Sequence, residues 1–211
     1  MVEFLDDDFL RHFWDFVRRG GYETRQRSDG RRAYYRFSRP RAADYPEMLE
    51  IFSRSPVGLS LADGQTIVPI PAQEDASSLS AILMDDDYYR IISDFRKVSS
   101  TLPLITPPGI ILLKARAWLD LEARRHAGEP VDGKHVRKHR NDVFRLARLL
   151  SQDERHVVPR RVFEDFRRFL AQHPEGSSEW GAIRASVGSD PPLPPVAAVL
   201  ELLERAFSAA D

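Results

Sequence analysis

Two groups of three consecutive aspartates are the first residues in this sequence that could hold a metal ion. They are Asp6-Asp7-Asp8 and Asp85-Asp86-Asp87. Carboxylates two positions apart on a strand project to one face, which is how phosphoryl-transfer enzymes use Asp-x-Asp to bind divalent ions. Both groups, however, directly precede segments with helical periodicity, where carboxylates cap free backbone N–H groups and stabilise the helix by roughly 0.5–2 kcal/mol. We therefore interpret both groups as helix caps.

Three charged residues on two predicted helices are stronger candidates for a binding site. Lys114 lies three or four positions from apolar residues of its own segment, so its stem must run along a largely apolar face. Asp142 lies in the next predicted helix, and Lys138 lies one turn before it. Either Lys114 and Asp142 form an ion pair between packed helices, or Lys114 and Lys138 hold nucleotide phosphates. The sequence leaves both interpretations open.

Residues 134–141 are the most basic segment of the chain, and they include Lys138 and Arg140. Such a helical face either is solvated or binds an RNA phosphate backbone, and it is the best local patch for RNA in this sequence. His135 and His139 lie one helical turn apart, a spacing at which two histidines can share a metal ion. The sequence offers no third ligand, and the neighbouring cations repel a metal. We therefore expect a solvated basic face here and not a metal site.

Glu50 is a further candidate metal ligand. It lies in segment 48–52, which predicts a strand, between Leu49 and Ile51. Neighbouring residues of a strand point to opposite faces, so Glu50 either faces solvent or ligates a metal on the side opposite to its two neighbours. Its position alone favours solvent.

Composition limits the classes of protein to which the chain can belong. With 211 residues, 42% of them hydrophobic, it is long enough for one large or two small domains with a real core. The absence of cysteine excludes disulfides, thiolate zinc sites and a cysteine nucleophile, and it favours the cytosol. No apolar run approaches the roughly 20 residues of a membrane span, so we expect a cytoplasmic protein without membrane contact. Because the net charge is −1, any binding of nucleic acid must come from a local patch.

The periodicity predicts an α+β fold, with a small, antiparallel-rich mixed sheet followed by a C-terminal helical bundle. The first part, residues 1–105, should hold a helix over 9–17, a hairpin of 22–27 with 32–37, and strands near 48–52 and 66–70, with strand signals fading after Pro71. The second part, residues 106–211, should be helical. The predicted helices from Asp86 onward are 86–95, 107–125, 134–150, 159–171 and 195–209.

Three segments carry a resemblance to a known family. They are residues 77–89, 111–121 and 132–146, the last two holding a lysine in an apolar helix and then a lysine-rich helix with an aspartate. Together they resemble the AbiEii/AbiGii-type nucleotidyltransferase toxins of bacterial toxin–antitoxin systems. The resemblance implies a nucleotidyltransferase-type core in residues 1–105. It also implies Mg²⁺ and an NTP as cofactors.

The same resemblance assigns roles to the candidate residues. Lys114 and Asp142 would be catalytic, Lys114 and Lys138 would bind the nucleotide, and Glu50 would be a metal ligand. The family's first motif, a Gly-Ser pair followed by Asp-x-Asp, has no counterpart before Glu50. One carboxylate cannot hold two metal ions about 3.5–4 Å apart. We therefore expect a shortened chain with impaired activity.

Two functional hypotheses follow. In the first, the chain is a nucleotidyltransferase-fold protein that ancestrally transfers a nucleotide from an NTP with Mg²⁺, with an RNA acceptor and an antitoxin protein as partners. In the second, it is a non-catalytic module that binds RNA or a protein through the basic helix 134–148. An incomplete sheet would in addition leave an exposed edge, which favours a homodimer.

Overall fold

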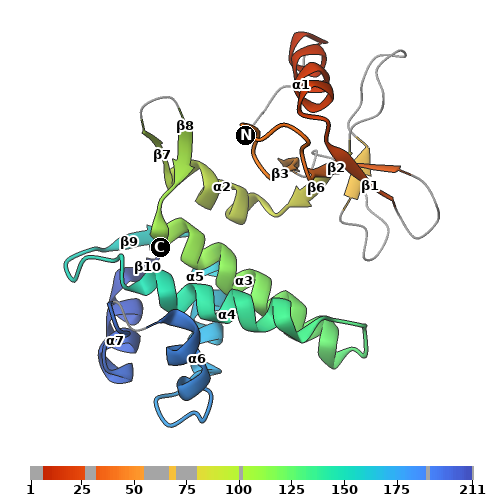
Figure 1. Cartoon of the computed structure of the whole chain (residues 1–211). Helices are drawn as coiled ribbons and strands as arrows, with labels where there is room; N and C mark the ends of the chain where they lie inside the picture. Colours follow the sequence, from red (N-terminus) through yellow and green to blue (C-terminus); the bar gives the residue numbers. More distant parts are fainter. Residues whose placement is uncertain are drawn as a thin grey trace. The chain divides into compact units, whose positions relative to one another are not determined.

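A computed structural model describes residues 7–26, 32–54, 67–69, 80–99, 102–188 and 191–210, and it is a mixed α+β structure as predicted (Figure 1). The chain divides into two compact units, Met1–Tyr89 and Arg90–Asp211. The division falls between Tyr89 and Arg90, whereas the sequence placed it between residues 105 and 106. No helix in the described ranges is long and apolar enough to cross a membrane.

The first unit opens with helix α1 (Asp7–Gly20) and an antiparallel sheet. The sheet has the order β1-β2-β3, with β1 (Glu23–Gln26), β2 (Arg32–Ser38) and β3 (Met48–Glu50). The predicted helix and the predicted pairing of β1 with β2 are thereby confirmed, while the predicted turn at 28–30 lies outside the described residues.

Aromatic side chains join α1 to this sheet. Phe37 of β2 is fully buried, and its ring lies 5.4 Å from that of Phe13 and 5.7 Å from that of Trp14, both edge to face. Each such aromatic pair stabilises the fold by about 0.5–1.5 kcal/mol beyond what the burial of its apolar surface contributes. The register of β2 with β3 places Phe37 opposite Leu49. The apolar face of α1 and the inner face of the sheet therefore share one small core.

A second small sheet follows in the same unit. It has the order β4-β6-β5, with β4 (Phe52–Arg54), β5 (Ile67–Pro69) and β6 (Ser80–Met84), and β6 runs parallel to β4 but antiparallel to β5. The prediction that strands end after Pro71 was wrong, because β6 is the central strand. The predicted strand 48–52 was also wrong in extent, since Ile51 separates β3 from β4 and the two lie in different sheets.

Helix α2 (Asp86–Asp94) spans the division between the units, and a hairpin of β7 (Arg96–Ser99) and β8 (Leu102–Ile105) follows it. The Asp85 carboxylate accepts a hydrogen bond from the Asp87 N–H at 3.1 Å. This geometry confirms that the second aspartate group caps a helix. The hairpin itself was not predicted from the sequence.

The second unit contains five helices among its described residues. They are α3 (Pro107–His126), α4 (Gly133–Ala147), α5 (Arg160–Ala171), α6 (Trp180–Val187) and α7 (Val196–Ala206). Helix α3 packs along α4 and α5, and α4 also packs on α6 and α7 (Figure 1). Short strands β9 (His156–Val158) and β10 (Phe207–Ala209) pair in parallel.

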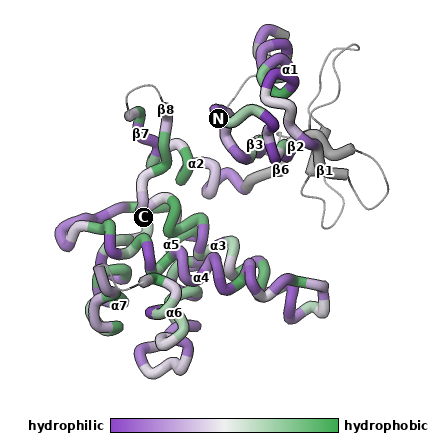
Figure 2. The backbone as a smooth tube through the Cα atoms, in the orientation of Figure 1, coloured by the Kyte–Doolittle hydropathy of each residue, from purple (hydrophilic) through white to green (hydrophobic). Residues whose placement is uncertain are grey.

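Aromatic rings fill the centre of this unit. Phe144 of α4 lies 4.6 Å from Trp180 of α6 and 5.8 Å from Phe169 of α5, and Trp118 of α3 lies 5.3 Å from Phe169. The buried residues of α3 lie between Pro108 and Trp118, whereas its end and the following turn are hydrophilic (Figure 2). The part of α3 up to Trp118 is therefore the part that packs in the core.

Candidate functional site

One face of α4 carries a shallow pocket of about 260 Å³. Its lining residues follow the helical spacing of three and four, which places them on one side of the helix. They are Lys134, Arg137, Lys138, Asn141, Asp142 and Arg145. The opposite side of α4 carries Val136, Val143 and Phe144, which are buried. The same amphipathic pattern that docks α4 on its neighbours therefore turns these polar residues outward.

The pocket is strongly positive. Four lysines and arginines face one carboxylate, that of Asp142. Arg145 is engaged, since it donates to Asp142 at 2.7 Å and to the Ser186 carbonyl at 2.8 Å. Lys134, Arg137 and Lys138 are exposed, and within the described ranges none of the three forms an ion pair or a side-chain hydrogen bond. Three cations are thus free to take an external anion.

Lys114 and Asp142, which the sequence singled out, are neighbours in the structure. The Lys114 ammonium lies 3.2 Å from the Asp142 carboxylate, and their side chains are 28% and 13% exposed. The predicted ion pair between the two helices is confirmed. Lys138 lines the pocket beside Asp142. Three of the four predicted site residues therefore meet around α4, although their catalytic and nucleotide-binding roles remain predictions.

Glu50, the fourth, belongs to the first unit. It lies on β3, and Arg36 of β2 donates from Nε to its carboxylate at 2.6 Å. Its side chain is 26% exposed, so the carboxylate is partly open to solvent. The arginine across the strand pair partly shields it. Its role as a metal ligand remains a prediction.

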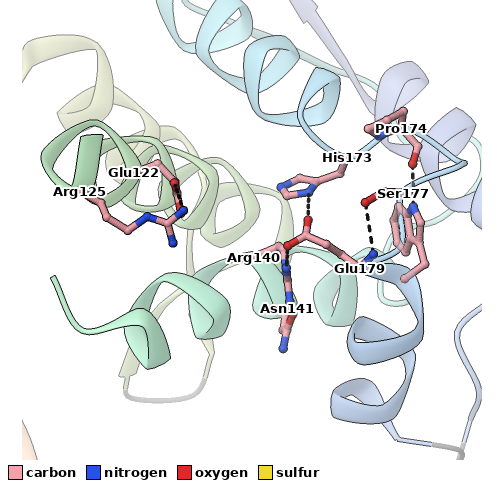
Figure 3. Close-up of polar contacts among 9 residues, drawn as sticks. Glu122, Arg125, Arg140, Asn141, His173, Pro174, Ser177 and Glu179 are labelled. Carbon is pink, nitrogen blue, oxygen red and sulfur yellow. Dashed lines mark hydrogen bonds and ion pairs between the residues drawn. The ribbon is translucent and has the colours of Figure 1, made fainter. Parts of the chain in front are cut away.

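Arg140 differs from the other cations of the basic segment. It is only 5% exposed, and its guanidinium forms an ion pair with Glu179, at the start of α6, and a 3.1 Å hydrogen bond to the Asn141 side chain (Figure 3). The interpretation of Arg140 as part of a solvated RNA-binding face was therefore wrong. A buried positive charge needs an oppositely charged partner, and the Glu179 carboxylate is that partner for Arg140.

The same cluster holds a buried histidine that the sequence did not reveal. His173 is 1% exposed, and its Nδ1 lies 3.3 Å from the Glu179 carboxylate (Figure 3). Burial lowers the pKa of His173 to about 4, with nearby Arg140 acting in the same direction and Glu179 against it. His173 is therefore neutral at pH 7. No spacing or motif in the sequence marks it, because its partners come from other helices.

The two histidines of the basic segment differ in exposure. His135 is exposed, while His139 is half-buried. Burial lowers the pKa of His139, and the positive charge of Lys114 lowers it further. Among the described residues, no group of three or more His, Cys, Asp or Glu side chains is arranged to hold a metal ion. The exposed lysines and arginine on α4 make this face suited to anions.

A comparison of the whole chain with protein-family models finds no match, and comparisons with curated proteins and with solved structures find no significant match.

Proposed function

We propose that the second unit binds RNA through its phosphate groups, using the exposed cationic face of α4. The observation that carries the proposal is the set of three cations, Lys134, Arg137 and Lys138, which lie on one helical face without a protein partner in the part of the chain that the structure describes. Phosphate contacts by lysine and arginine supply most of the affinity for nucleic acid when no base is read.

The distribution of charge favours RNA binding through this local face of α4 and not through the charge of the whole molecule. The whole chain has a net charge of −1, so long-range attraction does not draw it to RNA. Most other described cations are already paired, as Arg116 is with Asp120 and Asp165. A binding face must then be local, and the open shape of the α4 pocket admits a polymer as well as a small ligand.

The test is RNA binding by a variant that lacks the three cations. Lys134→Gln, Arg137→Gln and Lys138→Gln combined should weaken binding of a fluorescein-labelled single-stranded RNA at least tenfold in fluorescence anisotropy. Each lost phosphate contact lowers the slope of log affinity against log salt by about 0.7, so the slope should fall in magnitude by about 2.

A control variant with the same change of charge is available. Lys97, Arg160 and Arg167 are exposed residues outside the α4 face, and changing all three to glutamine removes three charges as well. If the control loses affinity to the same degree, or if the unchanged protein does not bind RNA, the proposal is wrong.

A second candidate function is nucleotide transfer from an NTP with Mg²⁺ by a nucleotidyltransferase-type core that a helical bundle follows in the sequence, with an antitoxin protein as partner. What favours it is the position of Lys114 and Asp142 beside a pocket that includes Lys138. In this hypothesis Lys114 and Lys138 bind the nucleotide and Lys114 and Asp142 are catalytic. Glu50, in the first unit, is the metal ligand.

NTP binding separates this hypothesis from the first. Each of the four NTPs with Mg²⁺ is added and the midpoint of thermal unfolding is measured, because a ligand that binds only the folded state raises it. A rise of several degrees for one NTP that Lys138→Ala abolishes would support the nucleotidyltransferase. No rise with any NTP, together with intact RNA binding, would exclude it.

A further inference from the structure

The side-chain amide of Asn141 has a fixed orientation. Arg140 donates from Nε to its oxygen at 3.1 Å (Figure 3). A guanidinium has hydrogen-bond donors and no acceptor, so the end of the amide that faces Arg140 must be the carbonyl oxygen. The amide NH₂ therefore forms the other end of a side chain that lines the α4 pocket.

Arg140 is well placed to hold this orientation. It is 5% exposed, and its guanidinium is fixed by the ion pair with Glu179, whose carboxylate also contacts His173 (Figure 3). Four side chains thus form a continuous series from the core to the pocket. Because these contacts already order the amide, binding a ligand there costs little side-chain entropy.

The Asp142 carboxylate is the only acidic group among the described residues that line the pocket, and it is already paired. Its Oδ2 faces Lys114 at 3.2 Å and its Oδ1 accepts from Arg145 at 2.7 Å. The remaining lining groups are donors, namely the ammonium groups of Lys134 and Lys138, the guanidinium of Arg137 and the NH₂ of Asn141. A pocket that presents donors alone suits a ligand that presents acceptors alone.

We propose that the α4 pocket seats one phosphate group and that Asn141 is a specificity-determining residue, which donates its NH₂ to a phosphate oxygen. This inference rests on the proposed function, since it concerns the same face of α4. Arg140 is the positioning residue that turns the NH₂ outward. An internal phosphate of an RNA chain, a 5′-terminal phosphate and a triphosphate share the chemistry that this site recognises.

The test is Asn141→Asp. An aspartate has the size of asparagine and keeps an oxygen for Arg140, so the fold should be retained, but it replaces the NH₂ by a second acceptor with negative charge. We expect at least a tenfold loss of affinity for the phosphate-bearing probe. Asn141→Ala, which removes the donor without adding charge, should lose three- to tenfold. Gln172→Glu, an equivalent change at an exposed position at the end of α5, should stay within twofold.

Three probes identify the source of the phosphate. They are an RNA oligomer with a 5′-hydroxyl, the same oligomer with a 5′-phosphate, and inorganic triphosphate as a competitor. A loss on both oligomers supports an internal phosphate, a loss confined to the 5′-phosphorylated oligomer supports a terminal one, and a loss confined to triphosphate competition supports the nucleotide.

Two results would overturn the inference. If the unchanged protein binds the probes and both Asn141 variants bind them equally well, the phosphate seat is wrong while the proposed function stands. If the unchanged protein binds none of the three probes, the proposed function fails and the phosphate seat fails with it.

Discussion

Lys114 and Asp142 form an ion pair that fastens α3 to α4, with the ammonium 3.2 Å from the carboxylate. The carboxylate is shared, since its other oxygen accepts a hydrogen bond from Arg145 at 2.7 Å. Asp142 is therefore the residue on which two cations depend, while Lys114 has a single carboxylate partner within the described chain. This asymmetry makes the two residues respond differently to mutation.

We expect Asp142→Asn to lower the free energy of unfolding by about 2–4 kcal/mol, because it leaves the half-buried Lys114 without a counter-charge. Lys114→Met should cost about 1 kcal/mol or less, since Asp142 keeps Arg145 and the methionine keeps the apolar stem. A double-mutant cycle by urea unfolding should give a coupling of about 1–2 kcal/mol. A coupling near zero would mean that the pair contributes nothing to stability.

Glycine at position 109 is required by close packing at the start of α3. A Cβ added there would lie 2.6 Å from the Phe95 Cβ and 2.9 Å from a methyl of Ile105. We expect Gly109→Ala to destabilise the protein by about 1–3 kcal/mol. Gly181, on the exposed side of α6, has nothing within 4 Å of such a Cβ, so Gly181→Ala should be neutral or stabilise by up to about 1 kcal/mol. Thermal unfolding of both variants checks the contrast, and equal shifts would contradict it.

Arg137 and Arg140 lie three positions apart on α4. We expect Arg140 to contribute to the stability of the fold, whereas Arg137 contributes little to it. We expect Arg140→Met to cost about 1–2 kcal/mol, because it removes the hydrogen bonds of a side chain that is 5% exposed, while the Glu179 carboxylate left behind is 45% exposed and stays solvated. Arg137→Met should stay within about 0.5 kcal/mol, since Arg137 is exposed. Chemical denaturation measures both changes in stability. A stable Arg140→Met protein would show that the buried cluster is dispensable.

The buried His173 predicts a dependence of stability on pH. Its pKa falls from 6.5 in the unfolded chain to about 4 in the folded protein, mainly because it is buried. Between pH 6.5 and about 4, His173 binds a proton in the unfolded chain but not in the folded protein. The stabilisation is therefore complete above about pH 6.5, is lost as the pH falls towards 4, and amounts to on the order of 3 kcal/mol.

The control for this prediction is His173→Gln, which has no titrating ring. Its free energy of unfolding should change less between pH 6.5 and 4 than that of the unchanged protein. His139 remains in the variant and contributes in the same direction, since burial lowers its pKa too. Equal pH dependence in both proteins would assign the effect to other groups.

Local signals in the sequence predicted the longer elements well. Pro107-Pro108 marks the start of α3, and Gly128 and Pro130 follow its end, so its bounds could be predicted closely. The strands β6 and β9 were missed because a short apolar run has no period of its own, and its partner strand decides its conformation. For the same reason the last predicted helix ends early, where Phe207–Ala209 pairs with β9 instead of continuing α7.

The candidate site could be predicted only where one helix supplies it. The spacing on α4 identified Lys138 and Asp142, and the apolar surroundings of Lys114 identified its partner helix. Arg140 was assigned to the wrong face, although it lies at helical spacing from the buried Val136 and Phe144. Its partner Glu179 lies 39 residues further along the chain, so no local signal indicated that a buried arginine would be paired. The orientation of the Asn141 amide depends in turn on Arg140, so it could not be deduced from the sequence.

The parallel pair of β9 and β10 has a consequence for the order in which the second unit folds. Helices α3 and α4 are consecutive and can meet by closing a short turn, but Phe207 reaches His156 only after α5, α6 and α7 have been placed between them. Closing so long a loop costs entropy before its contacts are gained. The β9–β10 pair is therefore expected to form late on the folding pathway, and changes at Phe207 should accelerate unfolding more than they slow folding.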